Sequence, residues 1–252
     1  MIVKNDEELT RLHAGGRKLS QILATLARAA RPGVTTRALD TLARELIQAA
    51  DGEPAFLNYR PAGAASPFPA ALCVSINDEV VHGIPGDRQL KDGDLVGLDL
   101  GLKYQGLYTD MAVTVGVGEI APSAQALLDV TRAALIAGIA AAKSGRKTGD
   151  IGFAIAKSVD KKQYDLVREF GGHGVGHRVH EPPEVPNVAT RGTGVRLESG
   201  LVIAIEPMVT IGSAAIVTAD DGWTIKTKSG ALAAHFEHTV LVTDDGPEIL
   251  TQ

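Results

Sequence analysis

Two amphipathic helices are predicted at the start of the chain. Leucine and isoleucine recur every three or four residues over 7–30, with polar residues between them. The Pro32-Gly33 dipeptide is expected to end this helix, and leucines spaced in the same way predict a second helix beyond it. The apolar positions are Leu9, Leu12, Leu19, Ile22, Leu23 and Leu26, then Leu39, Leu42, Leu46 and Ile47. Residues 51–71 are rich in Gly, Pro and Ala and are predicted to form a loop.

Apolar runs of β type predict strands in the middle and at the end of the chain. They are LCVSI, DLVGLDLG and LYTDMAVTVGV between residues 72 and 117, then GLVIAIEPMVTI, WTIKTK and HFEHTVLVTD after residue 199. Between the two groups, residues 122–143 and 148–160 have helical patterns. The segment 169–187 is rich in Gly, His and Pro and cannot form a regular helix.

The two groups of strands resemble each other. LVGLDLG (95–101) is similar to LVIAIEP (201–207), and TDMAVTV (109–115) is similar to FEHTVLV (236–242). In each half one acidic residue lies inside an apolar strand and a second acidic residue opens the next strand. We therefore expect two α/β half-units around a shared sheet, and one domain over residues 1–252 with an internal pseudo-repeat.

Composition excludes several classes of protein. With 44% hydrophobic and 22% charged residues, the chain resembles an ordinary globular protein. A net charge of −5 without a dense Lys/Arg tract argues against binding to nucleic acid or to an anionic membrane. The single cysteine, Cys73, cannot form an intrachain disulfide. The charged N-terminus lacks a signal-peptide pattern, and the longest uncharged apolar run is about half a membrane span. We expect a cytoplasmic protein.

Two aspartates lie in the first pair of strands. A turn centred on Tyr104-Gln105 would place Asp99 opposite Asp110, with Cβ atoms roughly 5 Å apart. Two like charges on an apolar sheet destabilise it unless a cation lies between them. The alternative is an exposed hairpin with two solvated acids, but the apolar neighbours of Asp99 favour the buried arrangement.

The second half of the chain adds two more acids in apolar strands. Glu206 lies in LVIAIEPM and Glu237 in HFEHTVLV, and neither run offers a nearby Lys or Arg. Four carboxylates balance two divalent cations in charge, and hard oxygen ligands suit such cations. His173, in GGHGVGH, would add a nitrogen ligand suited to Mn, Fe, Co or Zn, although a simple loop histidine is the alternative. His82 and His180 are individually ambiguous. No specific argument applies to four further histidines, which we expect at the surface or behind the ligands: His13, His177, His235 and His238.

Five residues in a fixed order carry a family resemblance. Asp99, Asp110, His173, Glu206 and Glu237 occur in LDLG, YTDMAVT, GGHGVGH, AIEPM and FEHTVLVT. Together with NDEVVHGIP and DGWTIKTKSGALAAHFEHT, this set resembles the type I methionine aminopeptidases of the pita-bread metallopeptidase fold, family M24. The resemblance covers nearly the whole chain. It implies an α+β fold in which two pseudo-symmetric α/β halves surround a curved, mainly antiparallel sheet. We expect type I because no zinc-binding extension precedes the first helix, and the interval between the two glutamates leaves no room for the type II insertion.

The resemblance implies a hydrolase that removes the N-terminal methionine from nascent proteins and peptides. Asp99 would bind one ion, His173 and Glu206 the other, and Asp110 and Glu237 both. The cofactors would be two divalent ions, Co, Mn, Fe or Zn, and a hydroxide shared by them would attack the first peptide bond. The implied catalytic residues are a proton shuttle, a donor to the tetrahedral oxyanion and a contact to the scissile amide nitrogen, namely Glu206, His180 and His82.

The resemblance also implies an apolar pocket for the methionine side chain. Its substrate-binding residues would be His82 and His180 with Phe68, Cys73, Trp223 and Tyr59. Core packing is the alternative for Cys73 and Trp223. Two departures from the family pattern fall here: Val179 replaces an aromatic residue before His180, and the 60–67 loop is longer than usual. Both would affect methionine selectivity.

The expected partners are N-terminal peptides and nascent chains, with at most transient ribosome association, no nucleic acid and no membrane. We expect a monomer. One rival is an Xaa-Pro aminopeptidase or prolidase with the same five ligands, although those relatives carry a sizeable extra N-terminal domain. Another is a binding protein that keeps the fold without catalysis, which would be expected to have lost ligands. The third is a metal-free oligomer scaffold, against which stand the acids in apolar strands that have no other evident partner.

Overall fold

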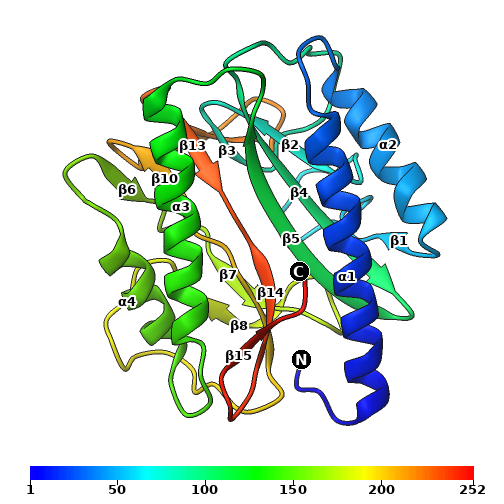
Figure 1. The fold of residues 1–252 in the computed structure, drawn as a ribbon, viewed down its shortest axis with the longest axis vertical. Coiled ribbons are helices and arrows are strands. Elements are labelled where there is room, and N and C mark those ends of the chain that lie inside the picture. The colour runs from blue at the N-terminus through cyan, green and yellow to red at the C-terminus, as the bar shows by residue number, and fades with distance from the viewer.

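The computed structural model describes residues 1–252 and places two pairs of helices on either side of a set of strands (Figure 1). The helices are α1 (Asp6–Ala29), α2 (Thr36–Ala49), α3 (Pro122–Ala141) and α4 (Thr148–Ser158). All four lie where the sequence predicts them. Their starts follow from local chemistry: the Asn5 side chain accepts a hydrogen bond from the backbone N–H of Glu8, and Thr35 caps α2 in the same way.

Every strand pairing in the structure is antiparallel. Four sheets result, ordered β1-β4-β2 with β5 beside β4, then β13-β10-β6, β11-β12-β3 and β15-β14-β9-β7-β8. The strands are β1 (Glu53–Pro54), β2 (Cys73–Ile76), β3 (Glu79–Val81), β4 (Leu95–Tyr104), β5 (Leu107–Gly116), β6 (Tyr164–Leu166), β7 (Gly172–Gly174), β8 (Glu181–Val185), β9 (Val202–Ile205), β10 (Met208–Ile211), β11 (Ile216–Thr218), β12 (Ile225–Thr227), β13 (Ala233–His235), β14 (His238–Val242) and β15 (Pro247–Ile249).

Each pair of helices covers its own strands. In the first half, Leu19 and Leu23 of α1 pack with Leu98 of β4 in one apolar cluster. In the second half, Leu127 of α3 and Ile205 of β9 belong to another. By length and composition alone α3 could span a membrane, but 44% of that stretch is buried inside the protein, as in a core helix. The α+β architecture expected from the sequence is confirmed.

The two halves meet where β5 lies beside the segment that contains β13 and β14 (Figure 1). Thr239 Oγ1 accepts from the Asp110 N–H at 2.8 Å and donates to the Asp110 carbonyl at 2.7 Å. Thr114 Oγ1 makes the same pair of bonds to the backbone of His235. Between these two links the Glu237 N–H donates to the Ala112 carbonyl at 2.9 Å. Two threonine hydroxyls and one backbone bond thus join the halves.

The predicted pairing of the two aspartates is wrong by two positions. Asp99 lies opposite Ala112 and Asp110 opposite Gly101. The reason is the turn, which is centred on Gln105-Gly106, one residue beyond the predicted centre; both residues have positive φ, as this two-residue hairpin requires. A shift of two positions in the pairing keeps the alternation of side chains along each strand. The aspartates therefore still share one face of the hairpin, now as a diagonal pair.

The sequence suggested that the two glutamates lie inside continuous strands, and the structure shows that they do not. Glu206 lies between β9 and β10, where Pro207 has no N–H for the ladder, and Glu237 lies between β13 and β14. The ladders on both sides of this gap keep one register, with Ile205 opposite His238 and Met208 opposite His235. The two glutamates therefore face each other across the gap in the ladder.

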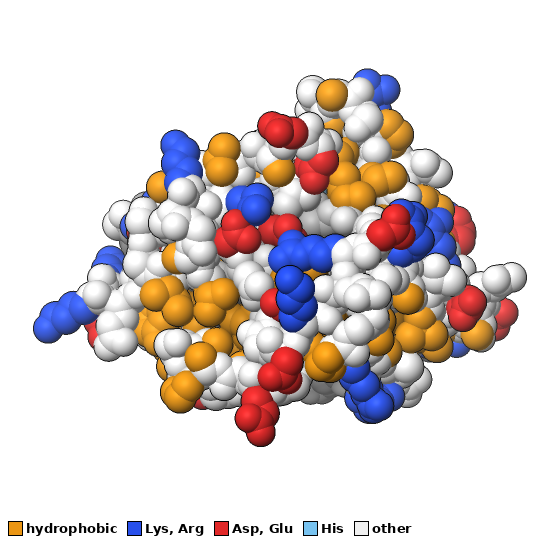
Figure 2. All heavy atoms as spheres, turned by 90° about the horizontal axis from the view of Figure 1, so that it is seen from above, with side chains coloured by type: hydrophobic (Ala, Val, Ile, Leu, Met, Phe, Trp, Pro, Cys, Tyr) orange, Lys and Arg blue, Asp and Glu red, His pale blue; other side chains and the backbone are white.

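The end of the molecule at the top of Figure 1 carries charges of both signs close together (Figure 2). Among the ion pairs at the surface of the protein, Arg37 pairs with Asp87. Exposed pairs of this kind contribute little to stability. The fold therefore depends on its apolar clusters and on the links between the halves.

A Thr239→Val substitution tests those links. Valine keeps the shape of threonine but leaves the buried N–H and carbonyl of Asp110 without partners, so we expect a loss of about 1–3 kcal/mol in the free energy of unfolding. Urea unfolding of the metal-free protein measures it. The control is Thr25→Val on the exposed face of α1, whose hydroxyl bonds only to its own helix. Equal effects of the two substitutions would contradict the proposed link.

Candidate metal centre and pocket

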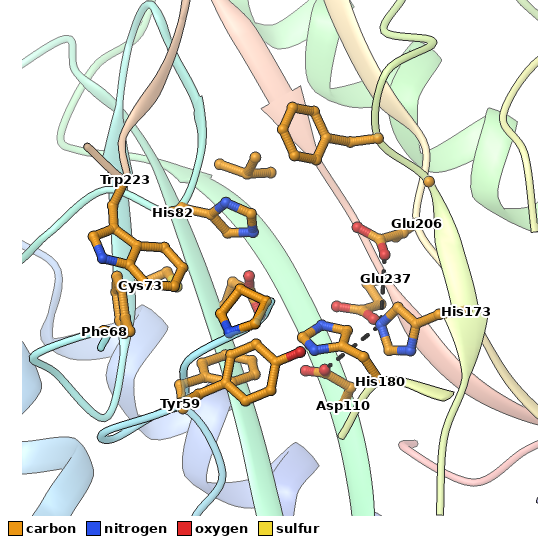
Figure 3. A pocket seen from close by; sticks show the side chains of 16 residues that line it. Tyr59, Phe68, Cys73, His82, Asp110, His173, His180, Glu206, Trp223 and Glu237 are labelled. Atoms are coloured by element: carbon orange, nitrogen blue, oxygen red, sulfur yellow. Dashed lines mark ion pairs between the residues drawn. The ribbon is translucent and has the colours of Figure 1, made fainter. Parts of the chain in front are cut away.

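One cavity contains every residue that the sequence singles out for chemistry. Its volume is about 220 Å³. Figure 3 shows the labelled aromatic side chains at one side of the cavity and the carboxylates with His173 at the other. The lining residues are Phe56, Tyr59, Pro61, Phe68, Cys73, Val81, His82, Asp99, Asp110, Phe170, Gly171, His173, His180, Glu206, Trp223 and Glu237. None of them is Lys or Arg.

The acidic side of the cavity is assembled from both halves of the chain. Asp99 projects from β4 and Asp110 from β5, while Glu206 and Glu237 project from the gap in the second ladder. His173 belongs to β7. Its neighbours Gly172 and Gly174 have no side chains, which allows the backbones of the adjacent strands to approach closely. These five residues are close neighbours in space although they span much of the sequence.

Ligand atoms of these residues form two overlapping groups of three. Asp99, Asp110 and Glu237 offer oxygens that all lie within 4.8 Å of one another, and so do the donors of His173, Glu206 and Glu237. His173 Nε2 lies 3.6 Å from Glu206 Oε1 and 3.9 Å from Asp110 Oδ2. A third group joins Asp110 and His173 to His180. Glu237 belongs to the first two groups, and two adjacent cations would require such a shared ligand.

The donor atoms fit divalent ions. Asp99 Oδ1 and Glu237 Oε1 are buried and accept no hydrogen bond from the protein. Buried carboxylate oxygens without a donor are strongly unfavourable unless a cation binds them. His173 Nδ1 lies 2.9 Å from the carbonyl of Gly174 and donates to it, which leaves Nε2 free as a ligand. Oxygen donors with one imidazole suit Mn, Fe, Co or Zn.

Burial and mutual repulsion raise three of the carboxyl pKa values. Burial, reinforced by Glu206 and only partly offset by His235, raises the pKa of Asp99 to about 7. Burial and the neighbouring carboxylates raise the pKa of Asp110 and of Glu237 well above the ordinary range. Without a cation, this side of the cavity therefore holds protons near neutral pH.

Glu206 behaves differently from the other three acids. Burial alone would raise its pKa, but the adjacent His235, followed by the charges of His173 and His180, lowers it overall. Glu206 is therefore the carboxylate that is ionised most readily. Its backbone carbonyl accepts a hydrogen bond from Asn187 Nδ2 at 3.1 Å, which holds the segment between the strands in place.

Two histidines stand between the acids and the aromatic side chains. Burial lowers the pKa of His82 to about 4 and that of His180 to about 3. Both rings are therefore neutral at neutral pH, each with one N–H to donate. His82 has a left-handed backbone with φ of 59°, a strained conformation that is typical of functional sites.

The remaining wall of the cavity is aromatic. The Phe68 and Trp223 rings meet edge to face at 5.2 Å, and the Tyr59 ring lies 4.9 Å from that of His180. Cys73 is buried opposite Asp99 in the β2–β4 ladder. All four residues predicted for the pocket line the cavity, so Cys73 and Trp223 belong both to the wall and to an apolar cluster.

Both departures from the family pattern are close to this wall. Val179 is buried in the same apolar cluster as Phe68 and Cys73. In the 60–67 loop, the Arg60 guanidinium donates to the carbonyls of Ala64 and Ala65, and Pro61 reaches the cavity. The loop is thus closed on itself by one arginine.

The sequence did not single out Phe56 or Phe170, and it gave His235 only a general place at the surface or behind the ligands. Phe56 and Phe170 line the cavity, and His235 lies behind it, 3.3 Å from Glu206. A signal for His235 was present, because it precedes Glu237 by two positions and such residues share a strand face. Of the other histidines, His238 is bonded to Thr251, while His13 and His177 lie near Glu248 and Glu8.

The comparison with known proteins agrees with this geometry. The model of metallopeptidase family M24 matches residues 10–244. The chain is 45% identical to the methionine aminopeptidase of Aquifex aeolicus, over 98% of this chain and 97% of that one. The crystal structure of methionine aminopeptidase from Rickettsia prowazekii superposes with a TM-score of 0.95 at 37% identity and covers both chains fully. The chain belongs to metallopeptidase family M24. Within that family its full-length likeness is to the methionine aminopeptidases, and the pita-bread fold is confirmed.

A more distant likeness concerns the fold alone. The prolidase from Pyrococcus furiosus superposes with a TM-score of 0.78 at 22% identity, and this chain covers 65% of it. The two proteins therefore share an architecture, while about a third of the prolidase has no counterpart in this chain. Family membership implies divalent metal ions, and the donor groups described above are suited to them.

The raised carboxyl pKa values predict a pH-dependent response to metal. Divalent ions must displace the protons held by the buried carboxyls, so the gain in melting temperature on adding Mn²⁺ should shrink as the pH falls from 8 to 6. His82 and His180 do not contribute to this trend, because burial lowers their pKa values to about 4 and about 3. Titration calorimetry in buffers of different ionisation enthalpy should show proton release on binding. A pH-independent gain without proton release would contradict the prediction.

Metal-free protein should show the opposite trend. A carboxyl whose pKa is raised to about 7 on folding favours the folded state when protonated. Stability of the metal-free protein should therefore fall as the pH rises from about 4 to 7, and Asp99→Asn should reduce that slope. Urea unfolding across this pH range measures the trend.

Proposed function

We propose that this chain is a metal-dependent aminopeptidase that removes the N-terminal methionine from peptides and nascent proteins. The observation that carries the proposal is the pair of overlapping ligand groups facing an aromatic pocket in one small cavity. Full-length relatives named methionine aminopeptidase support it. A cavity of about 220 Å³ suits a single side chain at the end of a peptide.

Five residues would hold two divalent ions. Asp99 would serve one ion, His173 and Glu206 the other, and Asp110 and Glu237 both. The two triads that share Glu237 favour this division, and Mn, Fe, Co or Zn would satisfy the donor set. Because the ligands come from both halves of the chain, residues 1–252 would act as one domain with an internal pseudo-repeat.

The bound ions would supply Lewis acidity and an activated water. The chain's own residues would provide the remaining steps. Glu206, the most readily ionised acid of the cluster, would take a proton from the attacking water and pass it to the leaving amine. His180 is neutral, adjacent to His173 and able to donate a hydrogen bond to the carbonyl oxygen as charge develops there. His82, between the aromatic wall and the acids, would contact the scissile amide nitrogen.

The pocket favours an apolar first residue. Phe68, Trp223, Tyr59 and Cys73 offer aromatic and sulfur surfaces, which suit a methionine thioether. A free α-amino group would be held by the acidic side, where no Lys or Arg competes with it. We propose a monomer that acts on chain ends in the cytoplasm and meets ribosomes only transiently.

A peptide panel tests the proposal. Protein loaded with Mn²⁺, Co²⁺ or Fe²⁺ is offered Met-Ala-Ser, Leu-Ala-Ser and Ala-Pro-Gly, and the released amino acids are identified by mass spectrometry. We expect methionine release to dominate. Glu206→Gln is the matched control, because the amide keeps the shape and removes the base; it should nearly abolish turnover while the protein stays folded.

Other outcomes would favour the rival functions. Cleavage of only the Ala-Pro-Gly peptide would indicate an Xaa-Pro aminopeptidase. Metal binding without cleavage of any peptide would indicate a binding protein. A metal-loaded Glu206→Gln variant with full activity would leave metal-dependent cleavage intact but remove Glu206 from the shuttle role.

Val179 generates a prediction about selectivity. Valine leaves more space than the aromatic residue of the family pattern, beside Phe68 and Cys73. Val179→Phe should therefore raise the preference for Met-Ala-Ser over Leu-Ala-Ser by roughly 10-fold, since small changes of fit in an apolar pocket change discrimination by about 1–3 kcal/mol. The ratio of kcat/KM for the two peptides measures it. An unchanged ratio would show that another residue sets the selectivity.

A further inference from the structure

A buried histidine behind the cavity faces the carboxylate of Glu206. His235 ends β13, is 4% exposed and is absent from the cavity wall. Its Nε2 lies 3.3 Å from Glu206 Oε2 but is not aligned as a hydrogen bond, and it bonds to no other atom of the protein. A buried ring nitrogen without a partner is unfavourable. The position of this ring therefore requires an explanation.

The backbone fixes where this ring lies. Thr114 Oγ1 accepts from the His235 N–H at 2.9 Å and donates to the His235 carbonyl at 2.8 Å. On the other side, His235 lies opposite Met208 in the β10–β13 ladder, two residues beyond Glu206. Diagonal neighbours on one face of a sheet are within reach of each other. Both adjoining strands thus direct the ring toward Glu206, independently of any bond that the ring makes.

The Glu206 carboxylate lies between two imidazoles. Oε1 lies 3.6 Å from His173 Nε2, and Oε2 lies 3.3 Å from His235 Nε2. Because His173 Nδ1 donates to the Gly174 carbonyl, its Nε2 offers a lone pair and is free to bind an ion. Oε1 is the oxygen on that side. Oε2 faces His235, whose Nε2 can carry the proton that a carboxylate accepts.

We propose that His235 is a positioning residue for the reaction: its Nε2–H donates to Glu206 Oε2 and keeps Oε1 directed toward the ion that His173 binds. The inference rests on the proposed function, because Glu206 has this role only in a metal-dependent aminopeptidase. The terminal torsion of a glutamate is broad, so an outer hydrogen bond is needed to decide which oxygen faces the ion. The 3.3 Å contact would shorten when the site is complete.

The alternative is that the His235 ring only fills space. His235→Phe keeps a ring of similar size without a donor, and His235→Gln keeps a donor, its side-chain amide, on a different shape. If His235 positions Glu206, the phenylalanine variant should lose about 10–100-fold in Mn²⁺ affinity and in kcat, with KM little changed. The glutamine variant should stay within a few-fold of the native protein in both quantities.

Three measurements separate these cases. Titration calorimetry gives Mn²⁺ affinity, the absorption spectrum of bound Co²⁺ reports ligand geometry without turnover, and melting of the metal-free protein reports the fold. A merely space-filling ring predicts that phenylalanine is tolerated and glutamine is not. That result, or equal behaviour of the two variants, would overturn the proposal.

A folding defect in the His235 variants would also decide whether the proposal holds. His235→Leu is a second variant without a donor and with a smaller side chain. Should both donor-free variants fail to fold without metal, His235 is a structural residue and the proposal is overturned. Should the native protein neither bind Mn²⁺ nor cleave Met-Ala-Ser, the proposed function fails. A native protein that does both, beside an unaffected His235→Phe variant, overturns this inference alone.

Discussion

Four carboxylates share one small cavity that has no lysine or arginine in its wall, and the rest of the structure accommodates that arrangement. Each buried charge repels the others and loses its hydration, so the cluster survives only as protonated acids or as ligands of cations. The raised pKa values of Asp99, Asp110 and Glu237 mean that, without a cation, these acids hold their protons. With divalent ions they are ligands instead, and exchange between the protonated and the metal-bound state couples metal binding to pH.

The seam between the halves holds these acids in place. Hydrogen bonds link Asp110 of β5 to Thr239, Ala112 to Glu237 and Thr114 to His235. Successive links are two residues apart in both segments. Threonine hydroxyls replace backbone pairing at both ends of the seam. The positions of Asp110 and Glu237 are therefore set by hydrogen bonds to their backbone atoms, which do not depend on the ions that their side chains would bind. This arrangement favours a site that is largely formed before metal arrives.

The amphipathic pattern and the order of the motifs predicted most of the fold and the candidate site. The helices were predicted because apolar spacing and helix-ending residues such as Pro32-Gly33 act within a few residues of each other. Four of the candidate ligands were predicted because an acid in an apolar run is conspicuous without any structure. His173 was predicted from the GGHGVGH segment and the family resemblance, and the lining of the cavity includes all five residues. The pairing of Asp99 was wrong because moving the centre of the hairpin turn by one residue moves every partner by two positions. His235 was expected only at the surface or behind the ligands, because its contact with Glu206 depends on the pairing of distant strands.

The chain by itself determined which residues are apolar enough to form helices and strands, and which acids cannot remain buried alone. Those properties follow from side-chain chemistry and from periods of 3.6 and 2 residues. Tertiary structure alone decided that Glu206 and Glu237 lie opposite each other where the ladder opens, and that the two ligand groups share Glu237. It also decided the direction of the His235 ring. These features depend on contacts between residues far apart in the chain, and such contacts follow from strand register and packing rather than from any local pattern.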